Sequence, residues 1–234
     1  MNACNPSFHE SIKDFYLSIF SPRLLYSRIM ICSNHFYRPF FVLIILSVLL
    51  DIFTKGSIRS MVGKIIPEGF IVELFPNNLK SWAVSETLHI LVFVSRFFFI
   101  AFILWIGMRL IIEKNCWRKI LSLVVRTGVI LLLIQVLTLV IYYLKSKAAV
   151  VDSKDIIIYL GPELFVKSTS LPLFSKHLLS GFNVPALWWL LILVFGLINL
   201  FKVSLSTAVP IVLGAWISWQ IFIFVVMDAL RRLG

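Results

Sequence analysis

The chain has 234 residues, of which 60% are hydrophobic and 14% are charged, and its mean hydropathy is +0.97. A soluble domain carries about 25% charged residues, so this composition excludes the ordinary soluble classes and indicates an integral membrane protein. The formal net charge of +11 does not indicate nucleic-acid binding, because the basic residues lie in polar segments between apolar runs, where they match anionic lipid headgroups.

Residues 1–36 precede the first apolar run and have an amphipathic pattern. Phe15, Leu25 and Ile29 are apolar positions between charged residues, and Pro22 divides the stretch into two short helices. We expect these helices to lie in the interface on the cytoplasmic side, and the alternative is a partly ordered tail. The segment lacks the apolar core of a cleavable signal peptide, so the first spanning helix should direct insertion.

Five later apolar runs approach or exceed the ~20 residues that a helix needs to cross a bilayer. The predicted fold is therefore all-α, a polytopic membrane helical bundle over residues 37–227, followed by a short tail, 228–234. The linkers 54–87 and 145–183 contain apolar pieces too short to cross, and the sequence leaves open whether they form surface helices or loops. The predicted spans cover about 37–53, 88–112, 120–144, 184–201 and 207–227.

The last two runs are joined by a short polar link, so they form an antiparallel hairpin. In the second arm a small residue recurs at every fourth position, which puts these residues on one helical face where another backbone can approach closely. We predict that this face meets another helix, and the alternative is that small residues are simply frequent in spanning helices. The predicted packing residues are Ser206, Pro210, Gly214 and Ser218, with Gly196 in the first arm.

Five spans place the two termini on opposite sides of the membrane. Positive charges in short loops close to helix ends weigh most in setting orientation, and the short turn 113–119 is dense in them. This favours a cytoplasmic N terminus. The three cysteines agree, since all would then face the reducing cytosol. The basic residues expected at the lipid interface are Arg23, Arg28, Arg38, Lys114, Arg118 and Lys119.

A few polar residues lie inside the predicted spans. An unpaired charge there costs about 3 kcal/mol, so we expect Arg96 and Arg126 each to extend to the nearer membrane surface. The functional alternative is that they bind a lipid phosphate, a carboxylate of a partner or a substrate. Gln135, Asn199 and Gln220 are expected to hydrogen-bond between helices.

The sequence contains no motif that would supply a catalytic or metal site. The four histidines are dispersed, and the chain has no HExxH helix, no Walker phosphate loop and no GxSxG elbow. We therefore predict no catalytic residue, no cofactor and no metal, and a protein that is not an enzyme. A membrane enzyme acting on lipid would need a nucleophile and a base clustered at one depth.

Several local features resemble one known family. An amphipathic N-terminal segment with a Ser-Pro step, Ile19-Phe-Ser-Pro22, leads to Arg38-Pro39 at the entry to the first span. The last hairpin contains Phe182-Asn-Val-Pro-Ala-Leu-Trp188, then Gly196 and Lys202-Val-Ser204. Together with the five spans, these features resemble the bacterial branch of the Yip-domain (Ypt-interacting protein) family.

The resemblance implies a non-enzymatic membrane subunit, and we expect it in a bacterial inner membrane. The orientation favoured by the basic turn then puts the N terminus in the cytoplasm and the C terminus in the periplasm. Some members are similar in role to accessory components of ABC exporters of the macrolide-exporter type. The Asp-Leu-Tyr-Gly-Pro string of eukaryotic members is absent, and Tyr159-Leu-Gly-Pro162 is only a fragment of it. A small-GTPase partner is therefore not implied.

Two hypotheses about function follow. The first is an accessory or scaffold subunit that associates with another membrane complex, such as an ABC transporter permease, or that also forms a homo-oligomer. The second is a small transporter or channel subunit in which Arg96, Arg126 and Gln135 line a path. The sequence identifies neither the partner nor a substrate.

Overall fold

The computed structural model describes residues 8–32, 36–62, 79–112, 116–147 and 172–233, and its regular structure within these ranges is helical. Much of the two long linkers, whose secondary structure the sequence left open, lies outside the described residues. The helices are α1 (Phe8–Phe20), α2 (Pro22–Cys32), α3 (Tyr37–Val62), α5 (Leu79–Arg109), α6 (Trp117–Thr127), α7 (Val129–Lys147), α8 (Leu173–Gly181), α9 (Val184–Phe201) and α10 (Leu205–Leu233).

Five helical segments of the described chain are long and apolar enough to cross a bilayer, which confirms the predicted all-α, five-span fold. The crossing segments are Tyr37–Ser57, Ala83–Arg109, Trp117–Leu144, Val184–Phe201 and Leu205–Ala229, and α6 and α7 together make the third.

The first span continues beyond its predicted end at residue 53. The apolar run stops there, but an ion pair of 2.6 Å between Asp51 and Lys55, one turn apart, carries the helix onward. Thr54 also donates a hydrogen bond of 2.7 Å to the carbonyl oxygen of Leu50. Polar contacts along the helix therefore extend it past the apolar pattern.

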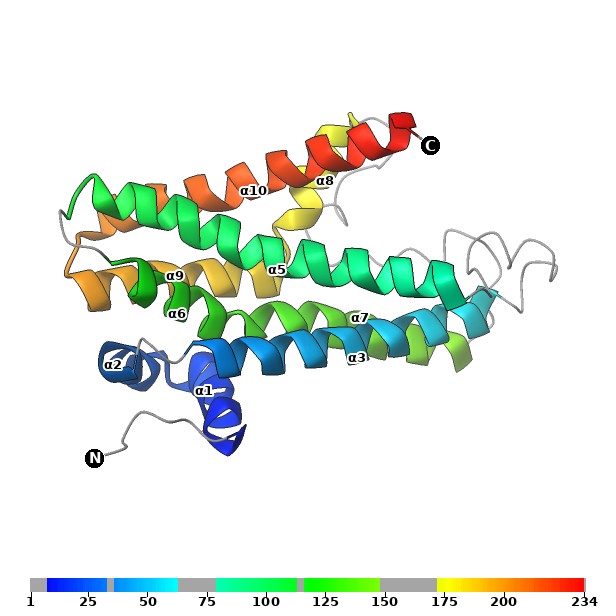
Figure 1. Ribbon diagram of the computed structural model, residues 1–234, viewed down its shortest axis with the longest axis horizontal. Coiled ribbons are helices and arrows are strands. Elements are labelled where there is room, and N and C mark those ends of the chain that lie inside the picture. Colours follow the sequence, from blue (N-terminus) through cyan, green and yellow to red (C-terminus); the bar gives the residue numbers. More distant parts are fainter. Residues whose placement is uncertain (1–7, 33–35, 63–78, 113–115, 148–171, 234) are drawn as a thin grey trace.

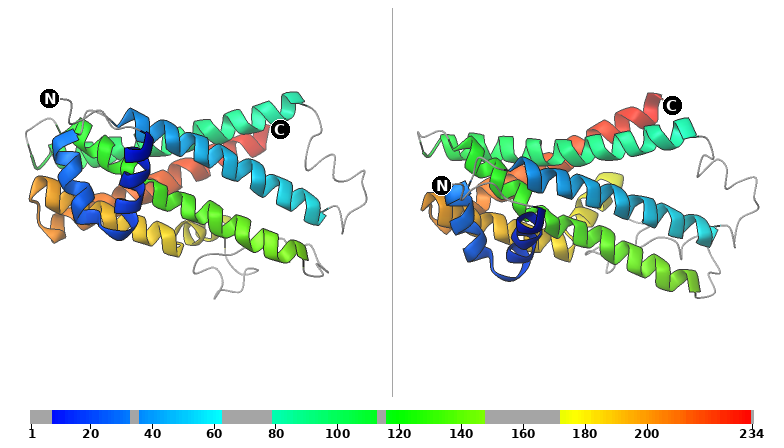
Figure 2. Two further views of the ribbon diagram at one scale, coloured as in Figure 1. Left: turned by 90° about the horizontal axis from the view of Figure 1, so that it is seen from below. Right: turned by 60° about the horizontal axis from the view of Figure 1, so that its bottom comes forward.

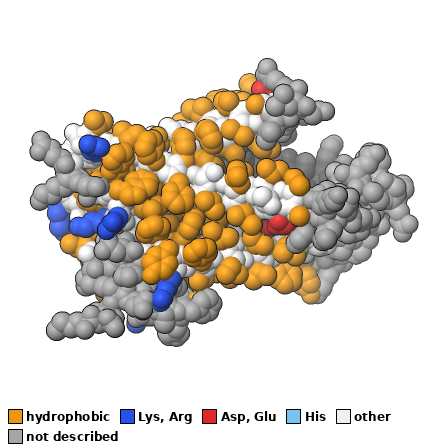
Figure 3. Space-filling view, in the orientation of Figure 1, with side chains coloured by type: hydrophobic (Ala, Val, Ile, Leu, Met, Phe, Trp, Pro, Cys, Tyr) orange, Lys and Arg blue, Asp and Glu red, His pale blue; other side chains and the backbone are white. Residues whose placement is uncertain are grey.

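The long helices run side by side along the bundle, and α1 and α2 lie across one end of it (Figures 1 and 2). The same end holds the start of α3, the start of α6 and the turn between α9 and α10. Basic side chains gather on this end in the space-filling view (Figure 3). We call it the basic end; among its residues are Arg23, Arg28, Arg38, Arg118, Lys119 and Lys202.

Helix α6 is the centre of the core at the basic end. Its residues from Ile120 to Thr127 are all buried, and α1, α2, α3, α5 and α9 all contact it. Gly196 of α9 packs against the side chain of Leu123, because a Cβ at Gly196 would lie 2.6 Å from a methyl carbon of that leucine. Small size at Gly196 therefore permits close helix approach within the chain itself.

Trp189 is also part of this core rather than an interfacial residue at a span end. Its indole is fully buried, and Nε1 donates a hydrogen bond of 3.0 Å to Oγ1 of Thr127. Tryptophans near the ends of spans often belong to the interfacial belt. The buried hydroxyl of Thr127 instead gives the indole N–H an acceptor inside the bundle.

The third span is broken at Gly128, where a continuous helix was predicted. The amide of Gly128 bonds to the carbonyl oxygen of Val125 at 3.1 Å, so the chain tightens by one residue between α6 and α7. A Cβ on Gly128 would collide with the ring of Phe97 on α5. The glycine therefore allows the aromatic ring to pack directly on the backbone at the break.

The N-terminal helices dock on the bundle through their apolar side. Leu25 and Ile29 are fully buried, and the phenol of Tyr26 donates a hydrogen bond of 2.7 Å to the carbonyl oxygen of Ile192 on α9. Burial raises the pKa of Tyr26 well above its ordinary value. These helices are thus packed against protein and not only against lipid.

A buried ion pair joins α1 to α6. Oδ2 of Asp14 lies 2.6 Å from Nη1 of Arg126, with the two side chains 0% and 1% exposed. Arg28 of α2 lies 2.8 Å from Oδ1 of the same carboxylate. The prediction that Arg126 extends to the membrane surface is therefore wrong, because a carboxylate from the N-terminal segment neutralises it inside the protein.

Substitution of Gly128 by alanine should destabilise the fold. The added methyl group must displace Phe97, and overpacking of this kind costs about 1–3 kcal/mol. Thermal unfolding of the purified protein in detergent measures the change. Gly56→Ala is the matched control, because a Cβ at Gly56 meets nothing within 4 Å. It should leave the melting temperature unchanged or raise it, and equal melting temperatures for the two variants would contradict the close contact with Phe97.

Asp14→Asn should loosen the N-terminal helices by leaving Arg126 buried without its counter-charge, at a cost of about 3–5 kcal/mol. Limited proteolysis after Arg23, followed by mass spectrometry, reports the loosening as faster cleavage. The Lys13→Gln variant changes the exposed neighbouring position and should be cleaved after Arg23 at the same rate as the wild type. The double variant Asp14→Leu with Arg126→Met should regain protection, and no regain would show that the pair is not the source of the attachment.

Candidate functional site

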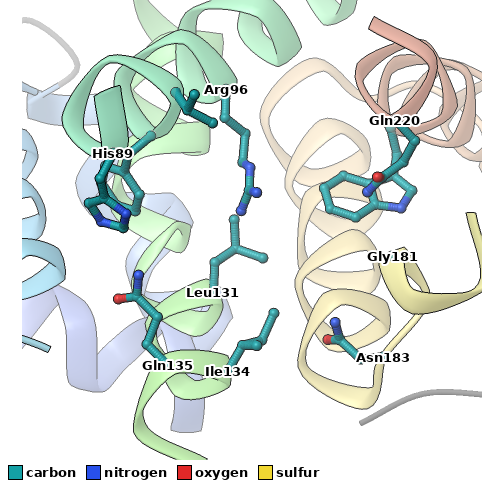
Figure 4. Close-up of a pocket in the computed structure, with 11 residues that line it drawn as sticks. His89, Arg96, Leu131, Ile134, Gln135, Gly181, Asn183 and Gln220 are labelled. Carbon is teal, nitrogen blue, oxygen red and sulfur yellow. The ribbon is translucent and has the colours of Figure 1, made fainter. Parts of the chain in front are cut away.

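A cavity of about 340 Å³ lies in the bundle among α5, α7 and α10 and beside the segment where α8 gives way to α9 (Figure 4). Its wall is polar on several sides although it lies among apolar helices. The lining residues are His89, Val92, Phe93, Arg96, Leu131, Ile134, Gln135, Gly181, Asn183, Trp216 and Gln220.

Helical periodicity brings these side chains to one place. His89, Phe93 and Arg96 are three or four residues apart on α5 and therefore lie on one face. Trp216 and Gln220 on α10 have the same spacing. Each helix thus turns one face to the cavity, and the polar residues on these faces come from segments far apart in the sequence.

The start of α9 forms one edge of the cavity. Oδ1 of Asn183 accepts a hydrogen bond of 3.0 Å from the amide of Ala186, which caps the helix. An 18-residue helix is about 27 Å long, shorter than α5 or α10, so α9 begins partway along its neighbours (Figure 1). The positive end of its dipole therefore adjoins the cavity.

Gly181 allows the segment before α9 to approach α10. A Cβ at this position would lie 2.6 Å from Nε2 of Gln220, so a larger residue would displace that amide. His177 lies on the preceding helix, α8, and partial burial lowers its pKa below the ordinary value. α8 is a short helix whose last residue, Gly181, lines the cavity, and it packs against α10.

A chain of polar contacts leads from the cavity toward the end of the bundle opposite the basic end. Nε2 of Gln135 on α7 donates to Oγ of Ser47 on α3 at 3.2 Å, and Ser47 also lies 3.0 Å from Nε2 of His89. Nδ1 of His89 is 3.8 Å from Asp51. Gln135 thus bonds between helices, as expected.

The chain of contacts ends in a cluster around Lys55. Its ammonium lies 2.6 Å from Asp51 and 2.7 Å from Glu86 of α5, and it donates to Ser85 at 3.0 Å. The sequence interpretation missed this cluster. The signal available for it was the spacing of four residues between Asp51 and Lys55, which places opposite charges on one helical face.

Arg96 extends its guanidinium toward the cavity (Figure 4). Its Cζ lies 5.7 Å from the ring centroid of Trp219, and its Nε is buried without a hydrogen-bond partner. The expectation that Arg96 satisfies itself at the membrane surface is therefore wrong. The aromatic face supplies part of the attraction that headgroups would have given.

The remaining predicted polar residues are distributed around the bundle. Gln220 lines the cavity with Arg96 and Gln135, whereas Arg126 does not line it. Asn199 donates to the carbonyl oxygen of Phe195, one turn earlier on its own helix, at 2.7 Å. It therefore makes a contact within α9 where one between helices was expected.

The predicted packing and lipid-interface residues lie elsewhere. Ser206, Pro210 and Gly214 are exposed on α10, and Ser218 is half-buried. The predicted interfacial basic residues of α2, α3 and α6 are at the basic end, and Lys114 is outside the described residues. None of the described residues among them lines the cavity.

The described lining of the cavity is rich in hydrogen-bond donors. Its described lining offers a guanidinium, three primary amides, an imidazole and an indole N–H, and it includes no hydroxyl, thiol or carboxylate. The described residues of the chain also hold no group of three or more metal-ligating side chains. The arrangement can orient a polar or anionic group between apolar walls.

Comparison of the chain with protein-family models, with curated proteins and with solved structures finds no match. The firm conclusion at this point is therefore the physical one. The chain is a multi-pass membrane protein, with five helices of the described residues long and apolar enough to span a bilayer.

Proposed function

We propose that the protein is a non-enzymatic accessory subunit of a membrane complex, and that it joins its partner through the face of α10 that carries Ser206, Pro210 and Gly214. The observation that carries the proposal is the openness of this face. A Cβ at Gly214 would meet nothing within 4 Å, and Ser206 and Pro210 are exposed as well. We call these three residues the small-residue face.

Other small residues of the spans have a packing role, which supports the same role for Gly214. A Cβ at Gly107 would lie 2.9 Å from Ile211, and Gly196 meets Leu123 at 2.6 Å. Close approach of helices in a membrane depends on such residues, because lipid offers no hydrophobic driving force between helices. On α10 the inward face is already packed through Val212 and Trp216.

The resemblance to the bacterial Yip-domain branch supports the class of partner. The features that carry it, Arg38-Pro39 and the hairpin from Phe182 to Ser204, suggest an accessory role beside an ABC exporter of the macrolide-exporter type. The gathering of arginine and lysine at the basic end (Figure 3) supports a cytoplasmic N terminus in a bacterial inner membrane. The C terminus is then periplasmic.

The alternative, a transporter or channel subunit with Arg96, Arg126 and Gln135 along one path, is weakened by the position of Arg126. That side chain is 1% exposed and paired with Asp14, while Arg96 and Gln135 line the cavity. The three residues therefore do not share one surface. An accessory subunit that acts by binding another membrane protein does not require Arg96, Gln135 and Arg126 to line one path.

Gly214→Leu should abolish partner binding without harming the fold. The leucine meets no atom of the chain, so the melting temperature should stay within a degree or two of the wild type, while recovery of the membrane partner in mild detergent should fall at least tenfold. Affinity purification from native membranes with quantitative mass spectrometry measures the recovery.

Two variants serve as controls. Leu187→Phe adds bulk at an exposed position of α9 and should keep the partner, whereas Gly196→Leu should unfold the protein through Leu123. The proposal fails if Gly214→Leu retains the partner at the wild-type level. It also fails if the wild type purifies alone or only as a homo-oligomer.

A further inference from the structure

The cavity contains a positive charge that no carboxylate of its described wall balances. The acidic residues on the helices that form the wall, α5, α7, α8, α9 and α10, are Glu86 and Asp228, and neither lines the cavity. Glu86 is bound by Lys55 at 2.7 Å. Asp51 on the neighbouring helix α3 also lies 2.6 Å from Lys55 and does not line the cavity either.

The two arginines deep in the spans therefore differ in kind. Arg126 has the carboxylate of Asp14 at 2.6 Å, whereas Arg96 has the ring of Trp219. The attraction of a cation to an indole face is smaller than the cost of placing a charge in the middle of a membrane helix. The aromatic contact therefore offsets only part of the cost of the buried charge, and an anion beside the guanidinium would offset the rest.

Two residues that line the cavity each carry a buried N–H group without an acceptor. Nε of Arg96 and Nε1 of Trp216 are both buried with no hydrogen-bond partner, and both residues line the cavity. Trp216 is only 3% exposed. A buried N–H without an acceptor keeps its full desolvation cost, so these donors favour a ligand that brings acceptor oxygens.

The remaining wall fits the rest of such a ligand. The amide groups of Gln135 and Gln220 can orient polar atoms, and the start of α9 turns its positive end to the same space. Val92, Leu131 and Ile134 provide an apolar side. A volume of about 340 Å³ accommodates an anionic group together with a short apolar body.

We propose that this cavity is a binding site for an organic anion, with one carboxylate or phosphate group held by Arg96 and Trp216 and an apolar body against Val92, Leu131 and Ile134. The anion can come from a membrane lipid or from a free amphiphile, because both present the same oxygens. The inference goes beyond the accessory role and does not depend on the small-residue face of α10.

Tryptophan fluorescence tests the proposal, because Trp216 lines the cavity and Trp219 contacts Arg96. In the first series, the protein is purified in a neutral detergent, depleted of lipid, and titrated with octyl phosphate and with decanoate. In the second series, the protein is placed in phosphatidylcholine nanodiscs that contain increasing amounts of phosphatidylglycerol. A saturable change with any of these anions is the expected result. A response confined to phosphatidylglycerol assigns the site to lipid, and a response to the soluble anions assigns it to free amphiphiles.

Arg96→Met should lower the affinity for the anion by at least about thirtyfold, which corresponds to the loss of a buried charge-assisted contact. Its melting temperature without ligand should equal or exceed that of the wild type, since an uncompensated charge is removed. Arg109→Met is the matched control. Like Arg96, Arg109 is an arginine of α5 that lies over a tryptophan ring, with its Cζ 5.2 Å from the ring centroid of Trp105, but it does not line the cavity. It should bind like the wild type.

Trp216→Phe keeps the ring and removes only the N–H donor, so it tests the same site if Arg96→Met does not fold. It should lower the affinity for the anion about tenfold, which is the effect of one lost hydrogen bond to a charged group. The proposal is overturned if decanol or an uncharged maltoside gives the same response as the anions. It is also overturned if neither Arg96→Met nor Trp216→Phe weakens binding, whereas Gly214→Leu should leave anion binding intact whatever it does to a protein partner.

Discussion

The ion pair between Asp14 and Arg126 determines how the basic end of the protein is assembled. A guanidinium in the core of a membrane bundle needs a counter-charge, and the residue that supplies it lies 112 positions earlier, on α1. The pair therefore requires the N-terminal helices to pack against α6. Once they do, Leu25 and Ile29 are buried and Tyr26 reaches the backbone of α9. The N-terminal segment is an integral part of the bundle for this reason.

The break at Gly128 follows from the same packing. α6 is surrounded by α1, α2, α3, α5 and α9, while α7 packs mainly against α3, so the third span changes its neighbours between the two helices. Gly128 permits the change because Phe97 lies where a side chain would be. The hydroxyl of Thr127, beside the break, is bonded to the carbonyl oxygen of Leu123 at 2.8 Å and receives the indole N–H of Trp189.

The sequence was sufficient for the spans and insufficient for their polar contacts. Apolar length is a local property, so five crossings could be counted from the chain alone, and the break between α1 and α2 follows from Pro22. The partner of a buried charge is a tertiary property. Asp14 gave no local signal that it would meet Arg126, and the same pattern of an arginine in an apolar run gave an ion pair at one position and a cation over an aromatic ring at the other. Arg96, Gln135 and Gln220 could be selected as polar residues, but their convergence on one cavity depends on helix rotation, which the sequence does not specify.

The charge of the cavity depends on Lys55, a residue that does not touch it. Asp51 lies 3.8 Å from Nδ1 of His89, and His89 lines the cavity together with Arg96, so a carboxylate is close to the wall. Lys55 holds that carboxylate at 2.6 Å and Glu86 at 2.7 Å, which confines the negative charge to the end of α3 and α5. One ammonium balances only one of these two carboxylates, but neither carboxylate lines the cavity, so the guanidinium of Arg96 is the charged group of its described lining. The selectivity proposed for the site thus rests on a polar cluster that also ties α3 to α5, so the same contacts connect stability with recognition.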